Sequence, residues 1–209
     1  MSRTVKWGIL STAKISRNHI IPAIKLSNNG EVVAIASRNS ESANEVAKSF
    51  GIKTAYGNYE DLLLGNGIDA IYNPLPNNLH LEYTLKALEK GKHVLCEKPI
   101  GLNANEAKEL KSYLKKFPNL KVMEAFMYKF HPQWISLKEL IKGGDIGAIK
   151  SIQTMFAYFN IDVDNIRNSV EAGGGALMDI GCYCVSFPRF ILDEEPISAF
   201  GAMQHDAGF

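Results

Sequence analysis

The chain has 209 residues, a formal net charge of +1 and a hydrophobic fraction of 46%. That length allows one large domain or two small ones with a substantial core. The balanced charge gives no sign of a nucleic acid or an anionic membrane as partner. The longest apolar runs fall well short of the ~20 residues that a membrane span needs. The totals therefore argue against a nucleic-acid-binding or membrane-spanning protein.

The three cysteines, Cys96, Cys182 and Cys184, make a poor disulfide framework, because their number is odd and two of them lie one residue apart. Cys182 and Cys184 also lack histidine or cysteine companions at zinc spacing. Lys6 interrupts the first apolar run, so we expect no signal peptide. These features predict a cytoplasmic protein with reduced thiols and no bound metal.

The first forty residues have the pattern of a βαβ unit that binds a dinucleotide. We expect strands over Val5–Leu10 and Glu31–Ser37, joined by a helix that Pro22 ends or kinks. The cofactor pyrophosphate would sit on backbone N–H groups where that helix starts, so the turn before it needs small side chains. A plain strand–helix turn is the alternative, because serine and alanine stand where the strict fingerprint has glycines. The predicted contacts of this turn are Ser11, Thr12, Ala13 and Ile15.

The end of the second strand indicates which cofactor is preferred. An NAD site usually places an acidic side chain there to hold the ribose 2′-hydroxyl. This chain has Ser37 and Arg38 followed by Asn39, and no acid. A guanidinium beside a hydroxyl suits a 2′-phosphate, because arginine can pair with it in a forked geometry. We therefore predict NADP(H) over NAD(H), with a solvated arginine as the alternative.

Helices and strands then alternate. We expect helices over Ser40–Phe50, capped by one of its serines, and over Tyr59–Leu64. A strand over Ile68–Tyr72 precedes a helix that starts at His80, which could also be a packing or capping residue. The loop between them follows the carboxyl end of a strand, which places it near the nicotinamide half of a cofactor. The predicted cofactor contacts here are Asn73, Pro74, Leu75, Asn78 and His80.

The next strand carries the main catalytic candidate. His93–Cys96 reads as a short buried strand, and it is followed by Glu97, Lys98 and Pro99. Ligands of open α/β sheets bind at the carboxyl ends of strands, and proline restricts the residue before it. We therefore expect Lys98 to be held at the site, with Glu97 beside the cofactor. The alternative is an exposed lysine and glutamate in an ordinary loop.

The alternation pauses after a strand at Lys121–Glu124, so we place a domain boundary there, giving domains 1–124 and 125–209. The second domain should contain a helix over Pro132–Lys142 and a long strand over Ile149–Phe159, rich in β-branched and aromatic residues. A long strand after a nucleotide-binding half suggests a second domain built on its own sheet.

A glycine run, Gly173–Gly175, leads into a helical pattern that carries Asp179 and Tyr183. These two residues are four apart, so they share one face of a helix. Asp179 could accept a hydrogen bond from a substrate hydroxyl, and Tyr183 could exchange a proton. A capping aspartate and a core tyrosine are the alternative.

Four segments together resemble the Gfo/Idh/MocA oxidoreductases, and especially the branch that holds dimeric dihydrodiol dehydrogenases, D-xylose dehydrogenases and glucose-fructose oxidoreductase. They cover nearly the whole chain. The segments are Trp7–Ala13, Glu97–Pro99, Glu124–Pro132 and Gly174–Tyr183.

The resemblance implies an α/β protein with an N-terminal Rossmann domain and a C-terminal α/β domain whose open sheet is mainly antiparallel. It implies that Lys98 lies near the nicotinamide and that Tyr183 is the acid/base or works with Lys98. It also implies that Asp179 and Arg167 contact a sugar, polyol or dihydrodiol substrate. Members of the family run well past Phe209, so the second domain is expected to be incomplete here and the full-length protein to be a homo-oligomer.

The expected reaction is reversible hydride transfer between a carbinol carbon and nicotinamide C4. A free tyrosine titrates near ~10, and a nearby Lys98 cation would favour the phenolate form of Tyr183. Two rival hypotheses stay open. One is a non-catalytic dinucleotide sensor or a truncated remnant, and the other is a reductase of a non-sugar carbonyl. Lys129, where relatives often have arginine, and Pro188, which we expect to interrupt the last helix, depart from the family pattern.

Overall fold

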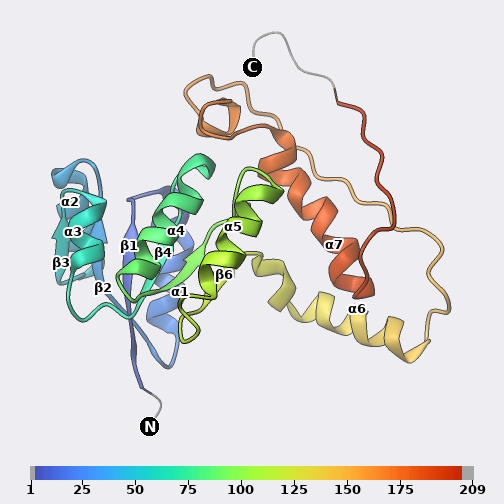
Figure 1. The fold of residues 1–209 in the computed structure, drawn as a ribbon, viewed down its shortest axis with the longest axis horizontal. Helices are drawn as coiled ribbons and strands as arrows, with labels where there is room; N and C mark the ends of the chain where they lie inside the picture. The colour runs from blue at the N-terminus through green and yellow to red at the C-terminus, as the bar shows by residue number, and fades with distance from the viewer. Residues whose placement is uncertain (1–2, 204–209) are drawn as a thin grey trace. The chain divides into compact units, whose positions relative to one another are not determined.

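Six parallel strands form the sheet that organises the first part of the chain (Figure 1). Residues 3–203 are described by the computed structural model of the protein. The sheet has the order β3-β2-β1-β4-β5-β6, which is the strand order of a Rossmann fold. The Rossmann prediction is therefore confirmed. The strands are β1 (Val5–Leu10), β2 (Gly30–Ala36), β3 (Thr54–Tyr56), β4 (Ala70–Asn73), β5 (His93–Cys96) and β6 (Val122–Glu124).

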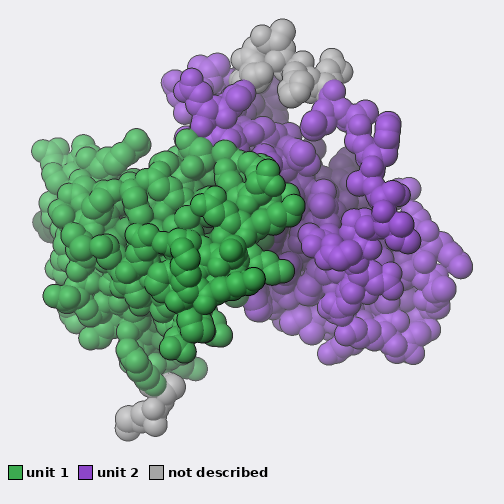
Figure 2. All heavy atoms as spheres, viewed as in Figure 1, with its two compact units in different colours: residues 1–125 green, residues 126–209 purple. Residues whose placement is uncertain are grey.

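The chain divides into two units, residues 1–125 and residues 126–209, which are coloured separately in Figure 2. The sheet belongs to the first unit. Its helices are α1 (Ile21–Leu26), α2 (Ser40–Phe50), α3 (Tyr59–Leu64), α4 (His80–Glu89) and α5 (Ala104–Leu114). No helix of residues 3–203 combines the length and the apolar character that crossing a membrane requires.

Side-chain alternation along the strands separates two apolar clusters, one on each face of the sheet. On β1, Ile9 belongs to one cluster and Leu10 to the other, and both are fully buried. The cluster with Ile9 includes side chains of α1 and α2, and the cluster with Leu10 includes side chains of α3 and α4. Both faces of the sheet are thus covered, as near-continuous apolar strands require.

Pro22 does not end the first helix. The helix passes through a π-helical turn over Ser16–Ile20 and then continues as α1, with Pro22 in its first turn. Proline has no N–H and clashes with the carbonyl four residues before it. A wider turn at this point accommodates both defects.

The caps of α2 differ from the prediction at one end. Asn39, and neither Ser40 nor Ser42, is the N-cap, and its side chain accepts a hydrogen bond from the Ser42 N–H at 3.0 Å. Asparagine is as good a cap as serine, and it lies one residue earlier, where the backbone is still extended. Gly51 ends the helix in the left-handed conformation.

The second unit is helical over its ordered elements. It contains a 3₁₀ turn (Met127–Phe130), α6 (Pro132–Gly143), a second 3₁₀ turn (Ile166–Asn168), a π-helical turn (Leu177–Gly181) and α7 (Cys182–Leu192). Within residues 126–203 the structure contains no strand, so the expected antiparallel sheet is not seen.

Two predictions for this unit are wrong. The segment Ile149–Phe159 is irregular, although its composition suits a strand. A strand needs a second strand to take up its backbone hydrogen bonds, and the described part of this unit offers none. Pro188 lies inside α7 without ending it, since the helix continues to Leu192.

Candidate active site

The carboxyl ends of β1 and β4 meet at the point where the strand order reverses, which is where open α/β sheets bind ligands. Ser11 follows β1 with φ 78°, in the left-handed region that glycine adopts easily. Its N–H donates to the Ala36 carbonyl at 2.9 Å, and its hydroxyl accepts from the Ala13 N–H at 3.1 Å. Ser11 therefore takes the conformation expected of a fingerprint glycine. Strained residues of this kind cluster at functional sites.

The neighbouring residues of this turn are also tied to the strand ends. Thr12 Oγ1 lies 3.0 Å from Ser42 Oγ, which links the turn to α2. Ser37 is buried, and its hydroxyl accepts from the Asn39 N–H at 3.2 Å. Arg38 is exposed. The small residues of the turn and this exposed guanidinium thus stand at the ends of adjacent strands, β1 and β2.

Tyr59 lies near the predicted cofactor residues, although no sequence pattern indicated it. Its ring belongs to the core and packs edge-on against Tyr83 at 5.4 Å. Burial raises the pKa of its hydroxyl, while the Arg38 cation and hydrogen bonds with Ser11 and Arg38 oppose that rise. The hydroxyl of Tyr59 therefore lies near both the β1 turn and the residue after β2. From sequence it read only as the first residue of α3.

The loop after β4 is held by its own side chains. Asn73 is fully buried, and its Nδ2 donates to the His80 carbonyl at 3.1 Å, while its Oδ1 accepts from the Leu75 N–H at 3.3 Å. His80 is also buried, and its two ring nitrogens face the carbonyls of Pro99 at 2.6 Å and Leu75 at 2.7 Å. The Asn73 and His80 side chains thus organise the loop around Pro74, Leu75 and Asn78.

Lys98 stands in the loop after β5, where the Lys98–Pro99 peptide bond is cis. Glu97 accepts a hydrogen bond from the Tyr72 hydroxyl at 2.7 Å. The Ile100 N–H donates at 2.8 Å to Oε1 of Glu124, which is the last residue of β6. Lys98 is partly buried and takes part in further interactions.

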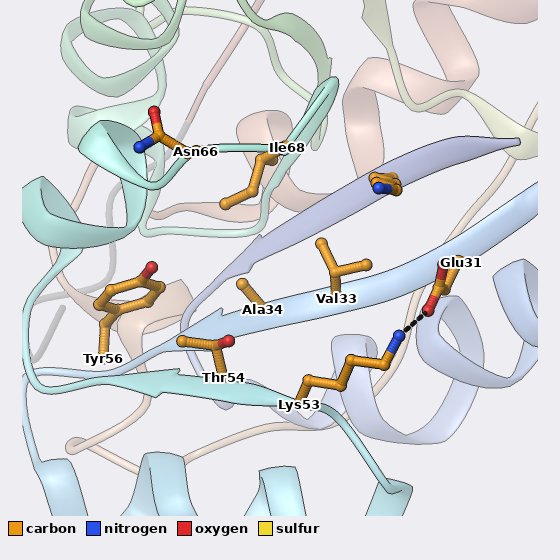
Figure 3. A pocket seen from close by; sticks show the side chains of 10 residues that line it. Glu31, Val33, Ala34, Lys53, Thr54, Tyr56, Asn66 and Ile68 are labelled. Carbon is orange, nitrogen blue, oxygen red and sulfur yellow. Dashed lines mark hydrogen bonds and ion pairs between the residues drawn. The ribbon is translucent and has the colours of Figure 1, made fainter.

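A separate hollow of about 220 Å³ lies elsewhere on this unit (Figure 3). Its lining includes Lys6 and Glu31 from the amino-terminal ends of β1 and β2, and Lys53, whose Nζ lies 2.8 Å from Glu31 Oε1. It therefore does not coincide with the carboxyl ends of these strands, where a dinucleotide would bind.

In the second unit, Arg167 and Asp179 form an ion pair with a separation of 3.1 Å between Nε and Oδ1. The other carboxylate oxygen of Asp179 accepts from the Tyr158 hydroxyl at 2.5 Å. Partial burial and the hydrogen bond to Asp179 both raise the pKa of Tyr158. The structure thus brings together two predicted substrate residues and adds Tyr158, which sequence reasoning had placed in a strand.

The glycine run explains how this pair is assembled. The Gly175 N–H donates to the Arg167 carbonyl at 2.7 Å, and the Asp179 N–H donates to the Gly175 carbonyl at 3.0 Å. A Cβ on Gly174 would lie 2.5 Å from the Arg167 carbonyl oxygen. Only glycine fits at this close approach of two backbone segments.

Tyr183 lies in the first turn of α7, surrounded by other aromatic rings. The ring centroids of Phe126, Phe156 and Tyr128 lie 5.3, 5.8 and 6.0 Å from its own. The Tyr128 hydroxyl lies 2.8 Å from Ser186 Oγ, one turn of α7 further on. Aromatic pairs at these separations are favourable, so the Tyr183 ring is well supported.

Two family models together match most of the chain. The model GFO_IDH_MocA, described as an oxidoreductase family with an NAD-binding Rossmann fold, matches residues 5–126. The chain belongs to the Gfo/Idh/MocA oxidoreductase family. The GFO/IDH/MocA C-terminal domain matches residues 134–208, so the second unit also has its counterpart in this Gfo/Idh/MocA family.

Relatives of this Gfo/Idh/MocA chain include enzymes of known reaction. It is 43% identical to D-xylose 1-dehydrogenase (NADP(+)) 2 of Haloferax volcanii, over 89% of this chain and 57% of that protein. It is 38% identical to trans-1,2-dihydrobenzene-1,2-diol dehydrogenase of Xenopus tropicalis, over 97% of this chain and 62% of that protein. The chain thus spans between 57% and 62% of the length of these curated relatives.

A solved relative is a 3-ketoreductase from Actinomadura kijaniata, in complex with NADP and TDP-benzene. It superposes on this Gfo/Idh/MocA chain with a TM-score of 0.85 and 34% identity, over 91% of this chain and 58% of that one. The predicted resemblance to the family, including its dihydrodiol and xylose dehydrogenases, is therefore confirmed.

Proposed function

We propose that this protein is an NAD(P)-dependent oxidoreductase that moves a hydride between nicotinamide C4 and a carbinol or carbonyl carbon. The proposed substrate is a sugar, a polyol or a dihydrodiol, as the names of the relatives suggest. The observation that carries the proposal is the position of Lys98 in an anchored loop, at the carboxyl end of β5. Catalytic groups of open parallel sheets belong at that edge.

The residues of the first unit fit a dinucleotide. The left-handed turn at Ser11 and the small Ala13 would let a pyrophosphate approach the backbone at the start of the helix closely. Ser37, Arg38 and the hydroxyl of Tyr59 provide polar contacts beside it. The remaining proposed cofactor contacts are Thr12, Ile15, Asn73, Pro74, Leu75, Asn78, His80, Glu97 and Lys98.

NADP(H) is the proposed preferred cofactor. Arg38 follows β2 at the position where an NAD-specific site usually has an acidic residue. A guanidinium can pair with a 2′-phosphate, whereas an acid would repel it. The Haloferax and Actinomadura relatives support the same choice, since one is named as an NADP(+) enzyme and the other was solved with NADP.

When bound, the nicotinamide ring would accept or supply the hydride. Oxidation of an alcohol also releases the hydroxyl proton, and we assign its transfer to Tyr183. The Lys98 ammonium stabilises negative charge on the oxygen that loses the proton, or relays that proton itself. Asp179 and Arg167 form a charged pair that would orient the substrate hydroxyls. Residues 1–124 would form the nucleotide-binding domain, and residues 125–209 would form part of a substrate and dimerisation domain.

The test uses Lys98→Met and, as a matched control, Lys108→Met, which changes an exposed lysine of α5. Each variant is assayed for NADP⁺ reduction with D-xylose, myo-inositol and trans-dihydrobenzenediol, and for NADPH binding by fluorescence titration. We expect Lys98→Met to bind NADPH nearly as well as the parent and to lose about 100-fold or more in kcat. Unchanged turnover in Lys98→Met would remove Lys98 from the mechanism.

The competing function is a dinucleotide-binding sensor without catalysis. It is favoured if the parent protein binds NADPH but reduces NADP⁺ with none of the three substrates at any enzyme concentration. A reductase of a non-sugar carbonyl would instead oxidise NADPH with ketone or enone substrates and leave the alcohols untouched.

A further inference from the structure

Three side chains from three different elements hold residues 97–100, the segment that contains Lys98. The Tyr72 hydroxyl, on β4, donates to Glu97 Oε1 at 2.7 Å. His80 Nδ1, at the start of α4, lies 2.6 Å from the Pro99 carbonyl oxygen. Glu124 Oε1, at the end of β6, accepts from the Ile100 N–H at 2.8 Å. Figure 1 shows these three elements in the first unit.

Burying the polar groups of these three side chains costs free energy. Tyr72 and His80 are essentially inaccessible to solvent, and a buried polar group destabilises the fold unless it is hydrogen-bonded. A phenylalanine and a leucine would fill the same core volume without that requirement. The N–H of the partly buried Ile100 needs a hydrogen-bond partner, but that partner need not be a carboxylate. Packing alone therefore does not explain the polar atoms of Tyr72, His80 and Glu124, whereas their contacts with residues 97–100 do.

His80 connects two loops and not one. Its Nε2 lies 2.7 Å from the Leu75 carbonyl oxygen, in the loop after β4, while Nδ1 faces the Pro99 carbonyl. A neutral imidazole has a single N–H and can donate to only one of these carbonyls. Burial lowers the pKa of His80, and both carbonyls oppose that change. Both ring nitrogens thus face loop carbonyls of the protein.

Between the anchors, Lys98 has little backbone freedom. On one side, Glu97 is bound by the Tyr72 hydroxyl. On the other side, the Pro99 carbonyl contacts His80 and the Ile100 N–H is bound by Glu124. Proline restricts its own φ and the conformation of the residue before it. The backbone of Lys98 is therefore held on both sides.

We propose that Tyr72, His80 and Glu124 are positioning residues that fix the loop bearing Lys98, so that its ammonium is in place before substrate binds. The inference rests on the proposed function of Lys98. A displacement of about 1 Å at a catalytic group can lower turnover about 100-fold. Loss of an anchor should therefore lower kcat and leave KM for NADP⁺ nearly unchanged.

The decisive variants are Glu124→Met and Glu124→Gln. Methionine has similar length but cannot accept the Ile100 N–H, whereas glutamine keeps an oxygen at that place. Glu109→Met, on the exposed face of α5, is the matched control. We expect Glu124→Met to lose about 10- to 100-fold in kcat, and Glu124→Gln to recover activity to within about threefold of the parent. Tyr72→Phe, which removes only a hydroxyl, should lower kcat about three- to tenfold.

A second measurement does not depend on turnover. Amide hydrogen exchange of peptides that cover residues 97–102 should be at least about tenfold faster in Glu124→Met than in the parent or in Glu124→Gln. Equal exchange in all three proteins would overturn the proposal, as would equal kcat values in an active parent. If the parent shows no turnover while hydrogen exchange responds as expected, the result supports the role of these residues in fixing the loop and contradicts the proposed function.

Discussion

Replacing Arg38 by methionine should weaken binding of NADPH and leave binding of NADH nearly unchanged. Arg38 is the first charged residue after β2, and its cation opposes the rise in the pKa of Tyr59 that burial causes. The two cofactors differ only in the 2′-phosphate, which carries negative charge that a guanidinium can pair with. Methionine keeps the length of the side chain and removes the charge and all its donors.

The expected magnitude follows from the exposure of Arg38. A hydrogen bond to a charged group contributes about 1.5–3 kcal/mol, and about 1.4 kcal/mol corresponds to a tenfold change in Kd. Arg38 is exposed, so screening by solvent and salt favours the lower end of that range. We therefore expect Kd for NADPH to rise about 10- to 30-fold at 0.1 M salt, and by less at 0.5 M.

The assay is a fluorescence titration of the parent, Arg38→Met and Lys48→Met with each cofactor. Lys48 is an exposed cation of α2 and controls for the loss of one positive charge. The ratio of the two dissociation constants is the quantity that matters, because a general folding defect would weaken both cofactors alike. A parent that binds NADH as tightly as NADPH, or an Arg38→Met variant that loses both equally, would refute the reasoning.

Gly174→Ala should destabilise the second unit by about 1–3 kcal/mol, because its Cβ would lie 2.5 Å from the Arg167 carbonyl oxygen. Thermal unfolding should show a lower Tm than for Gly201→Ala, which has open space, and equal values would contradict this. Burial raises the pKa of the Cys96 thiol from 9.0 to about 12. The unfolded chain then releases this proton at a lower pH than the folded one, so stability falls as pH rises from 9.0 to about 12. Urea unfolding should show a shallower decline over that range for Cys96→Ala, and identical slopes would count against the assignment.

The first unit was predictable because its signals are local. Short apolar runs separated by amphipathic helices fix the strands, and the helix over Ser40–Phe50 lies where its apolar face predicts it. The residues after each strand then follow from topology alone, because carboxyl ends of parallel strands share one edge. For this reason Ser11, Arg38 and Lys98 could be predicted as candidate site residues from the sequence alone.

The contacts that hold those residues could not be predicted in the same way. Tyr72 lies within an apolar strand and Glu124 at the end of another, and neither has a motif that reveals its partner. Their hydrogen bonds to Glu97 and Ile100 join residues 25 and 24 positions apart. Only the register of β4, β5 and β6 brings these groups together, and register is a property of the assembled sheet.

The segment Ile149–Phe159 shows the limit of composition as a guide. Its β-branched and aromatic residues describe a surface that fits a pleated sheet, but such preferences depend on the strands beside it. Within residues 126–203 no partner strand exists, and the segment contributes single side chains instead. Tyr158 donates to Asp179, and Phe156 packs against Tyr183. The segment predicted to be a strand thus contacts two candidate catalytic residues, Asp179 and Tyr183, through single side chains. A strand prediction gives no information about such contacts.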